Sequence, residues 1–570
     1  MSLLEVNGLT IRYGGEAVVD DLSFRLDRGE SLGLVGESGS GKTQTALALM
    51  GLNHPAAEVS GDIRLDGQPI AGLAEAELNQ VRATRMAMVF QDPTQSMNPY
   101  VRVGDQLSRI LLEHGLADEA VARERVGAML DRVGLPDPGR QYYAYPHELS
   151  GGMRQRVMIA AALVTEPDLL IADEPTTALD VTVQAQILAL LEELRDETAV
   201  LLITHDLGVV AGHCERMLVL SRGRRVEVGP TRKLFESPED VYTKTLVETA
   251  PRLGGSPSPA PLEADTLLEV RNLGVRYGRV RAVRSGRLTL GRGETVALVG
   301  ESGSGKTSLV RAVLGLVPAN TGDIVFLNRT LSSSIRDRRG MTLVFQDPIG
   351  SLNPQMRVRD VVAEPLLARG EPDVKIRVQT MLDRVGLDER FLDRFPHQLS
   401  GGQAQRVAIA RAVITSPDVL VCDEAVAALD GRVRTQILEL LSSLQAETGL
   451  SIIFISHDLA IVEGLSHRVM VMYLGRVVEI AHARDLFSKP AHPYTRALLA
   501  AVPEPDPMSN KLVELVRGET PSPVAPPIGC AFHPRCDHAI ARCRVERPML
   551  RPLFTAEVAC HRSEELNGVE

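Results

Sequence analysis

The chain of 570 residues carries a formal net charge of −11 and has a pI near 5.7. This balance argues against a protein held on nucleic acid mainly by phosphate contacts, because such proteins carry a basic excess. Hydrophobic residues make up 44% of the chain and charged residues 24%, which excludes a disordered chain and leaves room for about three to five globular domains.

No stretch of the sequence predicts a membrane span or a signal peptide. The longest apolar runs, such as Val157–Val164 and Val419–Cys422, are far shorter than the ~18–20 residues that a bilayer requires. The N-terminus lacks the basic region and apolar core of a secretory signal. We therefore expect a cytoplasmic protein, in which clustered cysteines indicate a metal site before they indicate disulfides.

The sequence contains two copies of one series of motifs, in the same order, which indicates a tandem duplication. We expect domains at residues 1–250 and 267–490, a linker rich in Pro, Gly and Ser at 251–266, and a third region at 491–570 that carries four cysteines. The paired motifs are Leu32–Thr43 with Val296–Thr307, Val89–Pro99 with Val344–Pro354, Pro146–Val157 with Pro396–Val407, Leu169–Asp180 with Val419–Asp430, and Ile203–Leu207 with Ile455–Leu459.

The first motif of each copy predicts a phosphate-binding loop. Residues 36–43 read GESGSGKT between the strand-like run Ser31–Val35 and the helix-like run Gln44–Leu52. Glycines let successive N–H groups point inward, and the helix N-terminus adds partial positive charge. Lys42 is expected to reach the β- and γ-phosphates and Thr43 to hold Mg²⁺. A Gly/Ser-rich turn is the alternative, which a single copy would leave open.

The two loops supply matching candidate nucleotide-binding residues. They are Gly36, Ser38, Gly39, Ser40, Gly41, Lys42, Thr43 and Gln44 in the first copy, and Gly300, Ser302, Gly303, Ser304, Gly305, Lys306, Thr307 and Ser308 in the second.

Two acidic residues end an apolar strand in each copy. Asp173 suits a Mg²⁺ ligand and Glu174 suits the group that polarises an attacking water. Asp423 and Glu424 repeat this pair. The alternative is an acid that caps the helix after the strand.

A histidine, His205 or His457, ends a further apolar strand in each copy. It is a candidate for sensing the γ-phosphate, with a satisfied core or capping histidine as the alternative.

The complete set of motifs resembles the ATP-binding cassette family over Leu4–Leu246 and Leu267–Leu499. The most specific element is LSGGMRQR at Leu149–Arg156, with LSGGQAQR at Leu399–Arg406. The resemblance implies an α/β fold with two P-loop NTPase domains in tandem, each with a helical subdomain, followed by a small cysteine-rich extension. It further implies that ATP and Mg²⁺ are bound and that the ATP is hydrolysed.

The resemblance assigns roles to further residues. It implies that the signature of each module binds the γ-phosphate held by the opposite module, so that one chain contains both composite sites. The signature residues are Ser150, Gly151 and Gly152 in the first module and Ser400, Gly401 and Gly402 in the second. The resemblance implies that Gln91 and Gln346 contact Mg²⁺ and lead into the partner-contacting loop. It also implies that Tyr13 and Tyr277 stack on adenine, and that Asp180 and Asp430 reach across the interface.

The second copy departs from the common family pattern after its acidic pair. It reads DEAVA at Asp423–Ala427, where the first copy reads DEPTT at Asp173–Thr177. The first signature continues with Met153 and Arg154, where the second has Gln403 and Ala404. Neither change removes a charged catalytic group, so we expect both sites to hydrolyse ATP.

The region after the second copy indicates the subfamily. HPYT-x-x-LL at His492–Leu499 resembles the oligopeptide, dipeptide and nickel importers, whereas the first copy keeps only Tyr242 and Thr243. The resemblance implies the energy-coupling subunit of a peptide importer. Such a subunit would lie on the cytoplasmic face of the membrane, with two permease subunits and an extracytoplasmic binding protein as partners and no nucleic acid.

The cysteine cluster also resembles the extension of that subfamily. Four thiolates suit tetrahedral Zn²⁺ or an iron–sulfur cluster, and zinc sites more often use closer cysteine pairs. The resemblance implies a [4Fe–4S] cluster on Cys530, Cys536, Cys543 and Cys560. His533, His538 and His561 are alternative ligands, and Cys214 and Cys422 are interpreted as small core residues.

Two other functions compete with the peptide importer. A two-cassette factor acting on ribosomes or DNA is disfavoured by the short linker and by the lack of room for an inserted coiled coil between Gly36 and Ser150. An exporter ATPase usually lacks the HPYT and cysteine-rich region. The sequence does not separate dipeptide, oligopeptide, nickel and glycan as substrates.

Overall fold

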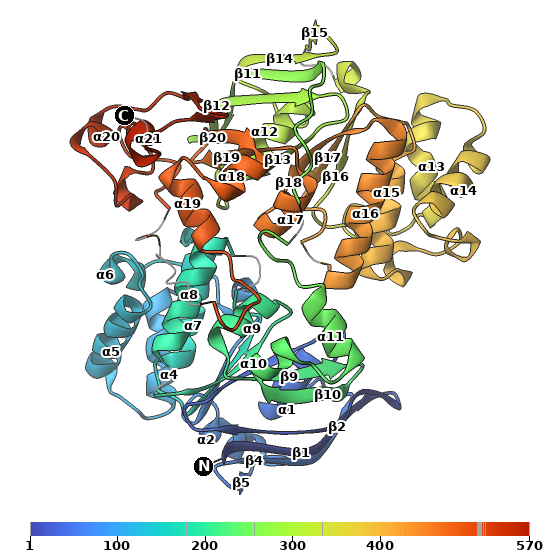
Figure 1. Cartoon of the computed structure of the whole chain (residues 1–570). Coiled ribbons are helices and arrows are strands. Elements are labelled where there is room, and N and C mark those ends of the chain that lie inside the picture. The colour runs from blue at the N-terminus through green and yellow to red at the C-terminus, as the bar shows by residue number, and fades with distance from the viewer. Residues whose placement is uncertain are drawn as a thin grey trace. The chain divides into compact units, whose positions relative to one another are not determined.

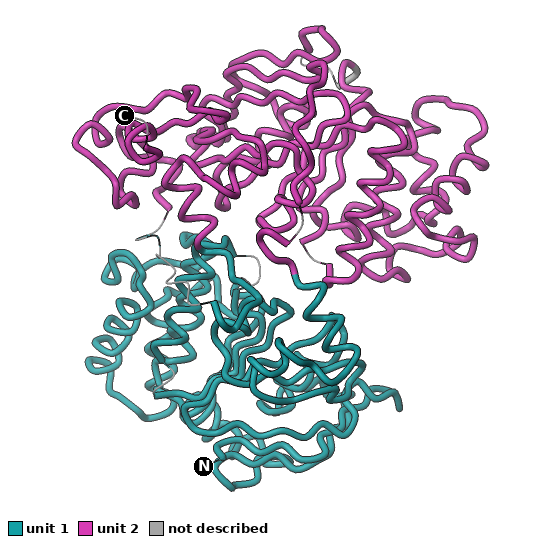
Figure 2. Tube along the Cα trace, in the orientation of Figure 1, with its two compact units in different colours: residues 1–250, 501–518 teal, residues 251–500, 519–570 magenta. Residues whose placement is uncertain are grey.

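The computed structural model describes residues 2–176, 179–194, 197–255, 257–332, 335–427, 429–509, 516, 518 and 520–568. The chain divides into two compact units, which are residues 1–250 with 501–518 and residues 251–500 with 519–570 (Figure 2). The segment after the second cassette thus packs with the first unit before the chain returns. One of its contacts is a hydrogen bond from Gln186 Nε2 to the carbonyl oxygen of Val516 at 2.6 Å.

The first unit contains an antiparallel sheet and a mainly parallel sheet (Figure 1). Strands of the parallel sheet such as β3, β7 and β8 are buried along their whole length, which explains their continuous apolar sequences. The antiparallel sheet has the order β2 (Glu16–Asp27), β1 (Ser2–Tyr13), β4 (Ala57–Leu65), β5 (Gln68–Pro69). The parallel sheet has the order β10 (Arg224–Pro230), β9 (Arg216–Ser221), β3 (Ser31–Val35), β8 (Ala199–Ile203), β7 (Leu169–Asp173), β6 (Met86–Val89).

Helices of the first unit cover the parallel sheet and form a separate helical group, in which α4, α5, α6 and α7 pack on one another. The helices are α1 (Lys42–Leu49), α2 (Glu75–Val81), α3 (Pro93–Ser96), α4 (Val103–Glu113), α5 (Glu119–Arg132), α6 (Pro138–Tyr142), α7 (Gly151–Leu163), α8 (Val181–Glu193), α9 (Leu207–His213), α10 (Thr231–Glu236) and α11 (Val241–Glu248), with a 3₁₀ turn η1 at Pro146–Glu148.

The second unit repeats this design, but its two sheets join into one because Ser285 of β12 pairs with Arg476 of β20. The sheet has the order β15 (Arg329–Thr330), β14 (Thr321–Phe326), β11 (Thr266–Tyr277), β12 (Val280–Gly291), β20 (Arg476–His482), β19 (Arg468–Tyr473), β13 (Thr295–Val299), β18 (Ser451–Ile455), β17 (Val419–Asp423), β16 (Met341–Val344). The helices are α12 (Lys306–Val313), α13 (Val358–Arg369), α14 (Val374–Arg384), α15 (Gly401–Val413), α16 (Gly431–Thr448), α17 (Leu459–Leu465), α18 (Ala483–Ser488) and α19 (Pro493–Ala500), with 3₁₀ turns η2 (Ile335–Arg338), η3 (Glu389–Phe391) and η4 (Pro396–Gln398).

The C-terminal extension adds a short hairpin to the edge of this sheet. Strand β22 (Ala556–Val558) pairs with β20 and with β21 (Arg551–Leu553). Leu553 and Val558 form a small apolar cluster with Ala491. The extension also contains η5 (His533–Arg535), α20 (Ala541–Val545) and α21 (Ser563–Leu566). The predicted fold class, two tandem α/β cassettes of the P-loop type, is therefore confirmed.

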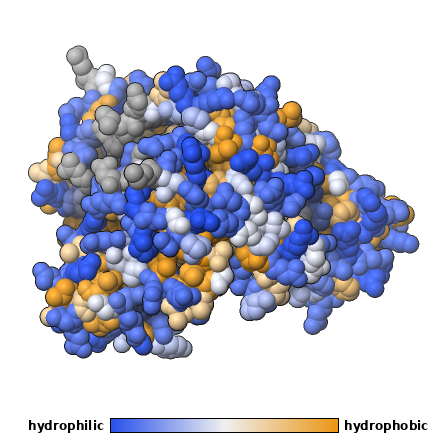
Figure 3. Space-filling model, turned by 90° about the horizontal axis from the view of Figure 1, so that it is seen from below, coloured by the Kyte–Doolittle hydropathy of each residue, from blue (hydrophilic) through white to orange (hydrophobic). Residues whose placement is uncertain are grey.

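No helix in the described part of the chain is long and apolar enough to cross a membrane. On the face shown in Figure 3, hydrophilic residues predominate and hydrophobic residues form scattered patches. Apolar side chains gather instead in the interior, where each unit has an extensive core around its sheets.

Equivalent glutamates in β10 and β20 anchor the segment that follows each strand, but they differ in how deeply they are buried. Glu479 is fully buried and its carboxylate accepts from the N–H groups of Ala491 and His492 at 2.8 and 2.9 Å. The half-buried Glu227 accepts from Glu239 and Asp240 at 3.0 and 3.3 Å.

This difference makes a stability prediction. Glu479→Ala should lower the free energy of unfolding of the second unit by about 2–4 kcal/mol, because two buried N–H groups lose their acceptor. Glu227→Ala should cost less than about 1 kcal/mol, since water can replace its carboxylate. Calorimetric unfolding of the full chain tests both variants, and equal losses would contradict the prediction.

Candidate functional site

The first phosphate loop joins β3 to α1. Lys42 is the first residue of α1, so the helix begins two residues earlier than the sequence predicts, directly after Gly41 with a left-handed φ of 102°. Gly36 leaves no room for a side chain, since a Cβ there would lie 2.1 Å from the carbonyl oxygen of Leu220. The loop therefore requires glycine at both positions.

The ammonium group of Lys42 lies over its own loop. Its Nζ donates to the carbonyl oxygens of Gly36 and Glu37 at 2.7 and 2.9 Å, and the residue is only 6% exposed. Burial lowers its pKa, whereas the charges of Glu174 and Asp173 raise it. A buried cation held by neutral carbonyl acceptors is well placed to exchange them for charged phosphate oxygens.

The second loop, between β13 and α12, repeats this arrangement closely. Gly305 has a φ of 101°, and Lys306 Nζ donates to the carbonyl oxygens of Gly300 and Glu301 at 2.7 and 3.0 Å. The serines before the glycine, Ser40 and Ser304, are buried in both copies. The other predicted loop residues are exposed or half-buried in matching places: Ser38, Gly39, Thr43, Gln44, Ser302, Gly303, Thr307 and Ser308.

The aspartates at the ends of β7 and β17 lie beside the loop threonines. Thr307 Oγ1 donates to Asp423 Oδ1 at 3.0 Å, and Thr43 hydrogen-bonds to Asp173. Burial raises the pKa of Asp173 to about 6, although Thr43 lowers it. Asp173 Oδ1 is buried without a hydrogen-bond partner among the described residues. An unpaired carboxylate oxygen beside a hydroxyl fits the oxygen ligands that Mg²⁺ prefers.

In the first cassette, three predicted site residues from three separate segments meet. Gln91 Nε2 donates to Glu174 Oε2 at 2.8 Å, and His205 Nδ1 lies 3.1 Å from Glu174 Oε1. These residues follow the neighbouring strands β6, β7 and β8, whose carboxyl ends share one edge of the sheet. The glutamate carboxylate is thus oriented from both sides.

The second cassette brings together the same three residues. Gln346 Nε2 donates to Glu424 Oε2 at 2.7 Å, and His457 Nδ1 lies 3.9 Å from that oxygen. The neighbouring imidazole of His457 lowers the pKa of Glu424, although burial raises it. Glu174 and Glu424 both have a left-handed φ, 47° and 51°. Such strain costs about 1–3 kcal/mol and is concentrated at functional sites.

The two predicted adenine-stacking tyrosines end the first strand of each unit. Tyr13 donates its hydroxyl to Gln44 Oε1 at 2.7 Å and is half-buried, whereas Tyr277 is 44% exposed. The stacking role of both tyrosines stays a prediction.

The signature residues begin α7 and α15. Ser150 Oγ accepts from the N–H of Met153 at 3.2 Å, and Ser400 Oγ from that of Gln403 at 3.4 Å. Gly151 is exposed, and no other atom lies within 4 Å of where its Cβ would be. Both helices therefore start at a serine cap followed by glycines, Gly151 with Gly152 and Gly401 with Gly402. Their role at the ATP site of the other cassette stays a prediction.

The acids after the DE pairs lie at the start of the next helices. Asp430 Oδ1 caps α16 by accepting from the N–H of Val433 at 2.9 Å, and Asp180 precedes α8. Capping of a helix is a common role of aspartate, whereas contact of Asp430 across the interface stays a prediction. Thr177, which ends the first DEPTT motif, lies outside the described residues.

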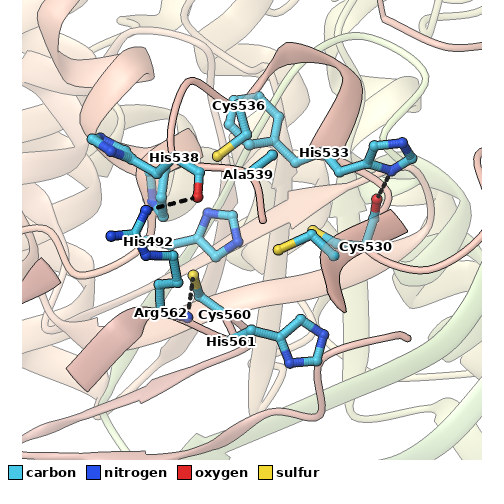
Figure 4. A pocket seen from close by; sticks show the side chains of 12 residues that line it. His492, Cys530, His533, Cys536, His538, Ala539, Cys560, His561 and Arg562 are labelled. Atoms are coloured by element: carbon cyan, nitrogen blue, oxygen red, sulfur yellow. Dashed lines mark hydrogen bonds between the residues drawn. The ribbon is translucent and has the colours of Figure 1, made fainter. Parts of the chain in front are cut away.

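All four clustered cysteines line one pocket of the extension (Figure 4). Burial raises the pKa of Cys530 to about 12 and that of Cys536 to about 11. His533 and His561, two alternative ligands, hydrogen-bond instead to the carbonyl oxygens of Cys530 and Glu546. His538 also lines this pocket, whereas the buried Cys214 and Cys422 lie elsewhere, in the core.

The expectation of a metal centre is not confirmed. Within the ranges that the structure describes, no three His, Cys, Asp or Glu side chains stand close enough together to hold one metal ion.

The sequence did not indicate that two tyrosines, Tyr242 and Tyr494, contact the phosphate loops through their side-chain hydroxyls. The N–H of Glu37 donates to Tyr242 Oη at 3.3 Å, and that of Glu301 donates to Tyr494 Oη at 2.8 Å. The signal was the glutamate at the same loop position in both copies, together with the shared Tyr-Thr pair.

Comparison with protein families identifies two kinds of segment. A family described as ABC transporter matches residues 19–177 and 283–427. A family described as the oligopeptide/dipeptide transporter C-terminal region matches residues 226–269 and 478–543, and so includes the tail of the first copy as well as Cys530, Cys536 and Cys543.

Similar proteins match along almost the whole chain. The glutathione import ATP-binding protein GsiA of Pectobacterium atrosepticum is 42% identical over 92% of this chain and 93% of its own length. GsiA of Escherichia coli K12 is 43% identical over 90% of this chain and 91% of its own. Among solved structures, cbiO1 from Clostridium perfringens, part of the ABC transporter complex cbiONQ, is 33% identical, with a TM-score of 0.37 over 40% of this chain and 92% of that chain.

Replacing the strained glutamates should uncouple nucleotide binding from hydrolysis. We expect Glu174→Gln and Glu424→Gln each to lose much of the ATP turnover, and the double variant to fall by about 10²-fold or more, because the amide does not accept a proton from water. Phosphate release by the purified chain measures this loss, with Glu193→Gln on the exposed face of α8 as control. Full turnover in either single variant would contradict two working sites.

Proposed function

The chain belongs to the ABC transporter ATP-binding family, and on that premise we propose that it is the ATP-hydrolysing subunit of an importer of short peptides. The observation that carries this proposal is the combination of two complete sets of ATP-site residues with a matched oligopeptide/dipeptide transporter region. Relatives named as glutathione import proteins, about 42–43% identical, support uptake of a small peptide. Glutathione is the first substrate to test.

The proposed chemistry uses the side chains that each cassette already brings together. Lys42 would leave the carbonyl oxygens of its loop for the β- and γ-phosphates. Glu174, oriented by Gln91 and His205, would accept a proton from the attacking water. Thr43 and Asp173 would hold Mg²⁺, with Gln91 in contact, and this ion supplies neutralisation of phosphate charge. Thr307, Asp423 and Gln346 repeat these roles in the second cassette.

The signature helices would complete the sites. Each presents a serine-capped helix N-terminus that starts with an exposed glycine, Gly151 or Gly401, and such a terminus is an anion-binding feature. We propose that Ser150–Gly152 contacts ATP on the second loop and Ser400–Gly402 ATP on the first. ATP would then draw together two cassettes of one chain, and its hydrolysis would release them.

The loops after Gln91 and Gln346 are the proposed contacts with two membrane subunits. Each loop carries an exposed apolar side chain. Tyr100 in the first is 88% exposed, and Ile349 in the second is 44% exposed. Exposed aromatic and aliphatic groups near a moving catalytic residue suit docking on a helix of a partner. An extracytoplasmic binding protein would deliver the peptide, and the chain would lie on the cytoplasmic face of the membrane.

Membrane docking can be tested with one exposed tyrosine. Affinity-tagged chain should co-purify with two integral-membrane subunits, and Tyr100→Asp should reduce their recovery about tenfold, because a buried charge would oppose the interface. Val241→Asp, at a residue 80% exposed elsewhere on the first unit, is the control. Recovery of ribosomes instead of membrane subunits would overturn the import proposal.

The four cysteines are proposed to hold a [4Fe–4S] cluster. A single zinc ion keeps four sulfurs about 2.3 Å from itself, and so roughly 3.8 Å from one another. A cluster spreads its thiolates over four iron atoms and needs them farther apart. The four thiols line one pocket, and their sequence spacings are wider than the close cysteine pairs usual for zinc, which supports the second arrangement. The cluster would supply rigidity to the extension.

Metal content tests this assignment directly. Chain purified without oxygen should be brown and contain iron and acid-labile sulfide, and Cys543→Ser should lose both because a thiolate ligand is missing. Cys214→Ser should retain them, since this buried cysteine lies in the core of the first unit. Stoichiometric zinc without iron would reverse the assignment.

A further inference from the structure

Glu301, the second residue of the second phosphate loop, is held through all of its polar groups. Its N–H donates to Tyr494 Oη at 2.8 Å, and its carbonyl oxygen accepts from Lys306 Nζ at 3.0 Å. The residue is 1% exposed. The backbone at this position is therefore fixed between the helix after the second cassette and the lysine expected to bind phosphate.

The carboxylate of Glu301 is bound by the cysteine-rich extension. Arg535 Nη1 donates to Oε2 at 2.8 Å and Nη2 to Oε1 at 3.0 Å, and Thr520 Oγ1 donates to Oε2 at 2.5 Å. Arg535 is only 5% exposed. This two-pronged geometry is the strongest form of an arginine–carboxylate pair.

Arg535 belongs to the short segment between two of the clustered cysteines. It ends η5 and directly precedes Cys536, five residues after Cys530. Its guanidinium lies 6.0 Å from the centre of the Tyr473 ring, and Tyr473, Tyr494 and Phe532 pack ring to ring with centroid distances of 4.7–5.4 Å. Movement of the cysteine-bearing segment would therefore reach the phosphate loop through well-packed groups.

The first cassette lacks this connection. Glu37 makes the same backbone contacts, with Tyr242 at 3.3 Å and Lys42 at 2.9 Å. Its side chain is half-buried, and its carboxylate has no hydrogen bond or ion pair to the residues that the structure describes. At this loop position the two cassettes therefore differ in the contacts of the glutamate carboxylate, which in the second cassette are made with Arg535 and Thr520.

We propose that Arg535, which lies in the four-cysteine segment, is a positioning residue for ATP binding at the second site and not at the first. The physical reason is charge. A buried carboxylate in a loop that must accept a triphosphate repels the ligand unless it is neutralised, and Arg535 neutralises it. This inference rests on the proposed function, in which residues 300–307 bind ATP.

A double-mutant cycle tests the proposal in the full chain, with Lys42→Ala added so that only the second site binds. MgATP affinity is measured by calorimetry. Arg535→Leu should weaken it at least about tenfold, because Glu301 keeps a buried charge without a partner. Adding Glu301→Gln should restore it to within about threefold, since the charge is then gone. Arg535→Lys, which keeps the charge but not the paired geometry, should give an intermediate affinity.

Two control variants separate a role at the second ATP site from a general effect on the protein. Arg551→Leu, at another arginine of the extension, should leave MgATP affinity unchanged. In a Lys306→Ala chain, Arg535→Leu should change the affinity of the first site less than about threefold. If the double variant binds ATP as weakly as Arg535→Leu, the arginine merely supports folding and the proposal is wrong.

A folding defect, or failure of the proposed function, can be distinguished from failure of this proposal. Should Arg535→Leu fail to fold, the double variant decides alone: binding near the level of the parent chain supports charge neutralisation, and absence of binding overturns it. Failure of the proposed function has a different signature, in which the Lys42→Ala parent itself does not bind MgATP.

Discussion

Each cassette depends on a lysine whose ammonium group is held by the carbonyl oxygens of its own loop. This geometry requires glycines where the backbone turns back and a buried strand before the loop, and it places the helix N-terminus beside the cation. Lys42 and Lys306 make nearly identical contacts, 2.7 Å to the first glycine and 2.9 or 3.0 Å to the following glutamate. The loop thus fixes the position of each ammonium group, at the cost of a buried charge.

The proposed hydrolytic residues are brought together by the parallel sheet around this loop. Gln91, Glu174 and His205 come from distant parts of the sequence, yet they meet because strands β6, β7 and β8 end at one edge. The left-handed φ of Glu174 and of Glu424 turns each carboxylate toward its partners. The strained backbone at each glutamate is held in place because the strands around it are buried along their whole length.

The two cassettes share their proposed catalytic residues but differ in what surrounds the phosphate loop. Glu479 and Glu301 are buried beneath the extension, whereas their counterparts Glu227 and Glu37 are half-buried. The extension therefore converts two partly solvated carboxylates into buried, fully paired groups on one side of a duplicated molecule. Unequal behaviour of the two ATP sites would follow from these surroundings even with equal chemistry at each site.

The sequence by itself determined the duplication and the fold class, and it supplied the candidate ATP-site residues, because glycine-rich loops and acid-ended strands require particular residues at fixed spacing. It also grouped the four cysteines, which line one pocket in the structure. It did not indicate where helix α1 starts, since the left-handed Gly41 sets that point. Nor did it single out Arg535 and Glu301, which lie 234 residues apart in the chain. Only the tertiary structure paired them, because burial of one charge demands its opposite, wherever the chain supplies it.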